Sequence, residues 1–281
     1  MTPKRLHARE LTFRSMTGDG HSHRILAYNV RYDLNEPGKR AWKDRRDAVA
    51  ETVHTQSPDI VAFQEVWKTQ LADLRERLPE FEWVVPTDGD EHAAIAYRSD
   101  RYDVVDSGSR WLSEPETPPG VAGWDSTFPK RFTYAILEER GRDSTRLAVF
   151  SIHLPHTGQR APRAALDLVL ETVGNVTDEL PTVITGDFNV EPGEDVYERA
   201  TSEQSGRREL AYATTRASVR EGPDVTFTGF PDEDEEELNI DHTLVTPDLS
   251  VERVVTVVPD RESTTFVPAD HRPIYVDVTV R

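Results

Sequence analysis

The stretch that decides the fold is PTVITGDFNVEPG, Pro181–Gly193. Its first part, Thr182–Thr185, is a short β-branched apolar run typical of a buried strand, and the run stops at the polar sequence GDFN. An extended chain points Asp187 and Asn189 to the same side. Open α/β sheets collect functional groups at the carboxyl ends of their strands, so these two side chains are candidates for water activation and oxyanion binding. Taken alone, the segment favours the alternative, an Asx turn that merely ends the strand.

Other segments favour a site because they also place polar side chains where apolar runs stop. These candidates are Asn29 after Ile25, Glu65 at the end of 59–65, His153 in 147–154, Asp241 in 238–245, and the adjacent Asp270 and His271 before the strand 273–280. Each has an ordinary explanation by itself, such as a capping acid or a hydrogen-bonded core histidine. Their repeated position at the ends of apolar runs predicts that they meet in one site.

Strand and helix patterns alternate from residue 24 to the C-terminus without a linker, which predicts one domain over 24–281. Helical stripes cover 41–56, 67–78, 161–176 and 194–201, and about a dozen strands surround them. So many strands exceed one parallel sheet, so we expect an α/β protein with two packed sheets flanked by helices. Residues 1–23 are polar and aperiodic, which predicts a disordered tail, and 113–129 form a long loop that either borders the site or is a surface excursion.

The net charge of −18 and the scarcity of lysine, five of 33 basic residues, are typical of a protein that works in concentrated salt. The same charge disfavours a broad surface for long nucleic acid. No Cys is present, which excludes disulfides and thiolate metal sites and favours a cytoplasmic location. No apolar run is long enough for a membrane span.

The candidate residues favour hydrolysis of a phosphoester. Glu65, helped by amide and aspartate oxygens, suits Mg²⁺ or Mn²⁺, which prefer oxygen ligands. The pair Asp270–His271 offers a base or stabilises charge on the reacting phosphorus. The sequence contains no HExxH, no GxxxxGK[ST] and no GxSxG, which disfavours zinc proteases, P-loop nucleotide hydrolases and serine hydrolases.

The segments YNVRYD, FQEV, WLSE, SIHLPH, GDFNVEPG, NIDHTLV and ADHRPI occur in this order over residues 24–281. Together they resemble the endonuclease/exonuclease/phosphatase superfamily, the deoxyribonuclease I-like fold. The resemblance implies a four-layer α/β/β/α sandwich of two mixed sheets and Mg²⁺-dependent cleavage of phosphoesters. GDFN followed much later by DH is the most specific part of the match.

The resemblance also implies roles for the candidates. It assigns Glu65, Asn29 and Asp270 to the metal, with Asn29 also positioning the catalytic acid, and Asp187 to water activation. It assigns phosphate contacts to His153 and Asn189, orientation of the last histidine to Asp241, and the closing catalytic position to His271. The stretch WLSEPETPPGVAGWD further resembles a microbial branch of this superfamily usually described as metal-dependent hydrolases. Two positions depart from that branch: Pro155 replaces a usual aspartate, and Pro162 lies near a usual arginine.

Three functions stay open. The first is a metal-dependent phosphoesterase acting on a small or single-ended phosphodiester or phosphomonoester. The second is a nuclease for DNA or RNA, and the third is a catalytically silent module that binds phosphate-bearing ligands. Arg131, Arg163 and Arg272 lie nearest the motifs and are candidates for phosphate contacts, although a surface ion pair is the more common role of each. The oligomeric state is not indicated.

Overall fold

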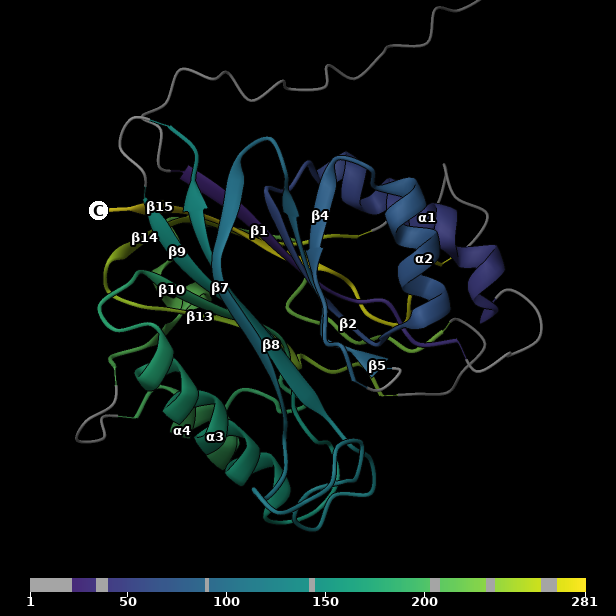
Figure 1. Cartoon of the computed structure of the whole chain (residues 1–281), viewed down its shortest axis with the longest axis vertical. Coiled ribbons are helices and arrows are strands. Elements are labelled where there is room, and N and C mark those ends of the chain that lie inside the picture. The colour runs from purple at the N-terminus through teal and green to yellow at the C-terminus, as the bar shows by residue number, and fades with distance from the viewer. Residues whose placement is uncertain are drawn as a thin grey trace, which may run out of the picture.

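The computed structural model describes residues 22–33, 40–88, 91–141, 145–202, 208–230, 236–258 and 267–281 (Figure 1). The expected tail lies outside these ranges up to residue 21. Ser22 and His23, however, belong to strand β1 (Ser22–Asn29), so ordered sequence begins two residues earlier than predicted. The reason is packing: the His23 ring is fully buried, and its Nδ1 lies 2.7 Å from the Tyr102 hydroxyl.

The helices are α1 (Trp42–Gln56), α2 (Lys68–Arg77), α3 (Ala161–Val176), α4 (Asp195–Ala200) and α5 (Ala213–Arg216). The strands after β1 are β2 (Ile60–Gln64), β3 (Val66–Trp67), β4 (Phe81–Val84), β5 (Glu91–His92), β6 (Ile95–Arg98), β7 (Tyr102–Trp111), β8 (Arg131–Glu139), β9 (Arg146–His153), β10 (Thr182–Asp187), β11 (Ala211–Tyr212), β12 (Val219–Glu221), β13 (Asp241–Val245), β14 (Leu249–Thr256) and β15 (Ile274–Val280).

The strands form two mixed sheets and a small two-stranded one, β3–β5. The first sheet has the order β12-β14-β15-β1-β2-β6-β4, and the second has the order β11-β13-β10-β9-β8-β7. Each large sheet contains a parallel pair near its middle, β1 with β2 and β10 with β9, whereas their other neighbours along each sheet are antiparallel. The prediction of two mixed sheets is confirmed.

Three apolar clusters show how the layers stack. Alternating side chains on each strand serve two clusters: Ile25 and Val183 pack between the sheets, whereas Leu26 packs against α1 and α2, and Ile184 packs against α3. Figure 1 shows α1 and α2 on one outer side and α3 and α4 on the other, with the sheets between them. The chain therefore forms the expected four-layer α/β/β/α sandwich. No helix in the described ranges has the length and apolar character needed to cross a bilayer.

The strand register brings the predicted residues to one edge of the sandwich. In the first sheet Asn29 pairs with Gln64, the residue before Glu65. In the second sheet Asp187 pairs with His153 on one side and Asp241 on the other. Because β1, β2, β9 and β10 all end at this edge, their last side chains face one another across the sheet interface.

A close contact beneath this edge holds the two sheets together. Gly186 has a φ of 138°, and a Cβ there would lie 2.2 Å from the Ile152 carbonyl oxygen and 2.7 Å from Gln64 Nε2, so only glycine fits. Gln64 crosses between the sheets and donates to Ser151 Oγ at 3.0 Å, and Ser151 donates back to the Phe63 carbonyl at 2.9 Å. The glycine of GDFN is thus explained by sheet packing.

Candidate active site

The Asp187 carboxylate lies at the centre of the site. Asn29 Nδ2 donates to Asp187 Oδ2 at 3.0 Å and lies 3.3 Å from Glu65 Oε1, so one amide joins acids from different sheets. The backbone N–H of Asn189 donates to Asp187 Oδ1 at 2.9 Å. That last bond is an Asx turn, so this residue both ends the strand and contributes to the site.

The expectation that Asp187 and Asn189 share one face of an extended strand is wrong. Strand β10 ends at Asp187, and Asn189 adopts a left-handed φ of 53°. Its Nδ2 donates to the Leu154 carbonyl at 2.8 Å, which fixes the side chain beside the end of β9. The two residues are still neighbours, but a turn brings them together.

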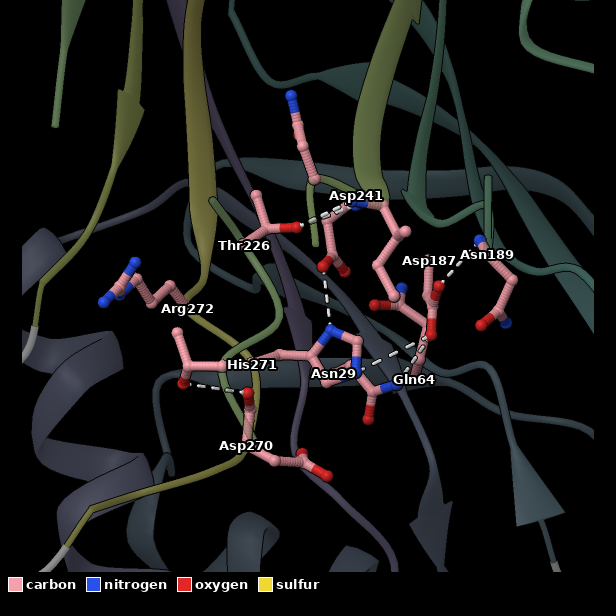
Figure 2. Close-up of polar contacts among 12 residues, drawn as sticks. Asn29, Gln64, Asp187, Asn189, Thr226, Asp241, Asp270, His271 and Arg272 are labelled. Carbon is pink, nitrogen blue, oxygen red and sulfur yellow. Dashed lines mark hydrogen bonds and ion pairs between the residues drawn. The ribbon is translucent and has the colours of Figure 1, made fainter. Parts of the chain in front are cut away.

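His271 faces Asp187 and is held by Asp241. Its Nδ1 lies 2.8 Å from Asp241 Oδ2, and its Nε2 lies 3.9 Å from Asp187 Oδ2 (Figure 2). Asp241 is itself fixed at the start of β13, because its backbone N–H donates to the Thr226 hydroxyl at 3.0 Å. The imidazole therefore lies between two carboxylates, with the Asp241 bond setting its orientation.

Burial sets the charge states of this group. Burial raises the pKa of Asp187 to about 7; the negative charge of Asp241 adds to the rise, and His271 opposes it. Burial alone would lower the pKa of His271, but the charge and hydrogen bond of Asp241, with Asp187 and Asp270, raise that pKa to about 10. Near neutral pH the site thus combines a carboxyl group close to its pKa with a protonated imidazole.

Glu65 and Asp270 lie at the same edge and offer oxygen atoms. Glu65 follows β2 in a left-handed conformation, φ 61°, and its Oε2 accepts the Tyr32 N–H at 3.0 Å. Asp270 is 3% exposed; its Oδ2 lies 3.7 Å from Arg31 Nε, and its Oδ1 has no hydrogen-bond partner among the described residues. Burial raises the pKa of Asp270 to about 6, and the charge of Glu65 contributes to that rise.

This pair fits a hard divalent cation. A buried carboxylate oxygen without a donor is costly unless a cation or solvent compensates it. Within the described part of the chain, no three acidic or imidazole side chains form a protein-made metal cage. Mg²⁺ needs no such cage, since it keeps several waters and is commonly held by one or two carboxylates. Asn29 Oδ1 accepts the Arg31 N–H at 3.1 Å, and its predicted metal role stays a prediction.

His153 completes the predicted set, and it contacts a lysine that sequence reasoning missed. Its Nε2 lies 3.3 Å from Asp187 Oδ2 and 3.9 Å from Glu65 Oε1. Lys130 Nζ lies 2.8 Å from the same nitrogen. Burial, and then the positive charge of Lys130, lower the pKa of His153 well below its ordinary value. The available signal was a rare lysine immediately before a buried strand.

The three arginines proposed for phosphate contacts have other partners. Arg131 Nη2 bonds Asp88 Oδ1 at 2.9 Å, and its guanidinium lies 4.2 Å from the centre of the Trp111 ring. Arg163 forms an exposed ion pair with Asp195 at 3.1 Å. Arg272 donates to the Val225 carbonyl at 3.1 Å. For Arg131, at the start of β8, the reason is that neighbouring residues on a strand face opposite sides. Arg163 lies on α3, where its partner is an exposed acid.

The loop 113–129 packs onto the segment that follows His153. Asp125 accepts backbone N–H groups at the start of α3, including Ala161 N at 2.8 Å. The exposed Phe128 stacks on His156 with ring centres 5.7 Å apart. Lys130 directly follows the loop and contacts His153, and His156 lies three residues after His153. The loop therefore lies at the site end of the second sheet, which favours the prediction that it borders the site.

The chain matches the Endonuclease/Exonuclease/phosphatase family over residues 26–271. A family member from Bacteroides vulgatus is 30% identical, with a TM-score of 0.85, over 92% of this chain and 99% of that one. The mannosyl-6-phosphatase Bt3783 of Bacteroides thetaiotaomicron is 28% identical, with a TM-score of 0.80, over 92% and 99%.

A more distant relative is the uncharacterized protein L388 of Acanthamoeba polyphaga mimivirus, 22% identical over 162 residues. The match covers 53% of this chain and 60% of that protein's length. Together with the sandwich fold and the GDFN and DH segments at one edge, the family match identifies the chain: it belongs to the endonuclease/exonuclease/phosphatase family, whose members are hydrolases that act on phosphoesters.

Proposed function

We propose that the protein is a metal-dependent phosphoesterase in which Asp187 activates the attacking water. The observation that carries this proposal is the Asp187 carboxylate itself: it is 2% exposed, contacts Asn29 and His153, and lies opposite the Asp241–His271 pair. Burial places its pKa at about 7, which suits a general base near neutral pH.

The other residues have complementary tasks in this proposal. His271, kept protonated by Asp241, faces the carboxylate and is placed to stabilise negative charge on the reacting phosphoryl group. Asn29 fixes the separation of Glu65 and Asp187 through its amide. When bound, a Mg²⁺ or Mn²⁺ ion held by Glu65 and Asp270 would supply positive charge to the phosphoryl oxygens.

We further propose that the substrate is small and carries a terminal phosphate. The net charge of −18 disfavours long nucleic acid. The similarity to a mannosyl-6-phosphatase favours phosphorylated sugars as the first compounds to test. The acidic, lysine-poor composition also supports work in concentrated salt, for which the cytoplasm of a halophile stays our prediction.

A screen of substrate classes tests these points. Wild-type protein and Asp187→Asn are assayed with Mg²⁺ or with chelator, in dilute buffer and in concentrated KCl, on phosphomonoesters, small phosphodiesters, DNA and RNA. We expect chelator-sensitive release of phosphate from small esters by the wild type alone. Activity in excess chelator would contradict metal dependence, and faster cleavage of DNA or RNA would favour the nuclease. Binding without turnover of any substrate would favour the silent module.

The pH profile gives a second test. Because Asp187 acts as a base, kcat/KM should rise as pH increases through the apparent pKa of about 7. Because His271 must stay protonated, kcat/KM should fall as pH approaches about 10. A bound cation favours the ionised carboxylate, so increasing Mg²⁺ should move the acidic limb to lower pH. A flat profile would contradict the assignment of these two groups.

A further inference from the structure

Lys130 is a buried cation beside the proposed catalytic residues. It directly precedes β8 and is only 8% exposed. Its Nζ lies 2.8 Å from Nε2 and 3.4 Å from Nδ1 of His153, whose Nε2 is 3.3 Å from Asp187 Oδ2. Burial is the larger influence at both neighbours; the positive charge of Lys130 lowers the pKa of His153 further and opposes the rise in the pKa of Asp187. The ammonium thus acts electrostatically on two residues of the proposed active site.

The position of Lys130 beside the ring is unlike an ordinary structural contact. The ammonium lies at similar distances from both ring nitrogens, 2.8 and 3.4 Å. A hydrogen bond directed along the lone pair of one nitrogen would leave the other nitrogen much farther away, so the ammonium is not in line with either lone pair. Burying an ammonium is costly, and a methionine would fill the same space without that cost. A role for the charge itself accounts for the lysine better than packing does.

An incoming phosphoryl group needs positive charge at this side of the site. It would meet the carboxylates of Glu65, Asp187 and Asp270, which repel it. Arg31 lies at the Asp270 side, 3.7 Å from that carboxylate. Arg45 donates to the backbone carbonyls of Val30 and Pro268, both at 2.7 Å, and so serves the fold. Among the residues that the structure describes, Lys130 is the cation in contact with His153.

We propose that Lys130 binds a phosphoryl oxygen of the substrate from the second sheet, next to His153. This inference rests on the proposed phosphoesterase function. It also narrows the substrate class, since a lysine contact favours a dianionic terminal phosphate over a monoanionic diester. Lys130 is then a substrate-binding residue, and His153 positions its ammonium.

The experiment compares Lys130→Met, Lys130→Arg and Lys130→Gln with the wild type. Lys43→Met is the matched control, because Lys43 is exposed on α1 and the substitution removes the same charge. Melting temperatures establish folding. Equilibrium binding of inorganic phosphate is measured by calorimetry in the presence of Mg²⁺, and KM, kcat and phosphate inhibition are measured with a phosphomonoester and a small phosphodiester.

We expect Lys130→Met and Lys130→Gln to weaken phosphate binding about 10- to 100-fold, the value of one charge-assisted hydrogen bond. Lys130→Arg should recover most of the affinity, and Lys43→Met should match the wild type. The loss in kcat/KM should be larger for the monoester than for the diester. Because two neutral variants of different shape are used, failure of one to fold leaves the test in place.

The outcomes separate this inference from the proposed function. Unchanged phosphate affinity with reduced kcat would overturn the inference, because Lys130 would then only position His153. Lysine-dependent phosphate binding without hydrolysis of any ester would keep the inference and contradict the phosphoesterase. If the wild type binds no phosphate, the assignment of Lys130 is overturned. If that wild type still hydrolyses a phosphoester, the proposed phosphoesterase function stands.

Discussion

The two ends of strand β1 hold the same kinds of charged side chain in opposite arrangements. At its start, Arg24 bonds both carboxylate oxygens of Asp277, at 2.7 and 2.9 Å. Nearby, Arg101 lies 2.7 Å from Asp59 and 2.6 Å from Glu139. Burial opposes the charge on each arginine, yet Asp277 raises the pKa of Arg24, and Tyr102 together with the two acids raises the pKa of Arg101, above the ordinary value. Every acid named here has a guanidinium partner.

At the other end of β1, acids are gathered with fewer direct partners. Asp187 and Asp241 share one imidazole, and Asp270 keeps an oxygen without a hydrogen-bond donor among the described residues. Here burial raises the pKa of Asp187 and Asp270. Paired charges stabilise one end, whereas burial holds the carboxylates of the other end in the state that our proposed function requires for reaction and ion binding.

Removing the central groups of the site should have the largest effect. We expect Asp187→Asn and His271→Ala each to lower kcat by about 10³-fold or more, since both act on the same reacting group. If they form one unit, the double variant should lose little beyond the worse single variant. Steady-state kinetics on folded protein checks this. Losses that multiply would show that the two residues act independently.

The second-largest expected effect is on metal affinity, which should depend on the site end of β1 and not on the paired end. Glu65→Gln removes an oxygen charge at the site, and we expect the affinity for Mn²⁺ to fall about 10²-fold. Asp277→Asn, at the paired end, is the matched control and should leave Mn²⁺ affinity unchanged. Titration calorimetry measures both. Equal effects of the two substitutions would remove the distinction drawn between the ends.

Substitution at the paired end of β1 should lower the stability of the fold and leave activity intact, the reverse of what we expect at the site end. Arg101→Met leaves the partly buried Asp59 and Glu139 without their shared partner, and we expect a loss of about 2–3 kcal/mol in the free energy of unfolding. Kcat below the unfolding transition should stay within about twofold of the wild type, because the pair is remote from the site. Denaturant titration and kinetics together decide the point. A large loss of kcat in folded protein would contradict it.

The smallest expected effect is a gain in stability at the site end. The folded pKa of Asp187, about 7, exceeds its ordinary value, so the stability contributed by the neutral form is complete at acidic pH and is lost as pH rises through 7. Asparagine cannot ionise. In chelator above that pH, Asp187→Asn should therefore be more stable than the wild type by about 1–2 kcal/mol. The difference should shrink on acidification; a variant that is less stable at every pH would refute the assignment.

Much of the fold and most of the site were accessible from sequence because the signals were local. Apolar runs ending in polar residues located β1, β2, β9 and β10, and the register then brought Asn29, His153, Asp187 and Asp241, with Glu65 directly after β2, to one edge. The other three predicted residues, Asn189, Asp270 and His271, reach this edge from segments outside the named strands. The contacts between the two sheets could not be predicted from such local signals. The contact of Gln64 with Ser151 depends on how the two sheets pack, which no local pattern specifies.

The failures have the same origin. Arg131 was a candidate because it lies near the motifs and arginine suits phosphate, whereas Lys130 was not considered; the alternation of a strand turns these two neighbours to different surroundings. The geometry of Asn189 was mispredicted because the strand ends two residues earlier than an extended GDFN requires. In both cases the residue type indicated a candidate, but the sequence did not indicate where the side chain points.

The position of the site across the sheet interface makes turnover a reporter of assembly. Asn29 and Glu65 come from one sheet, and His153 and Asp187 come from the other, held at a fixed separation by the close approach at Gly186. A partly folded chain with one sheet formed would contain only half of these four proposed site residues. Recovery of activity during refolding therefore times the docking of the sheets, whereas circular dichroism times the formation of strands and helices.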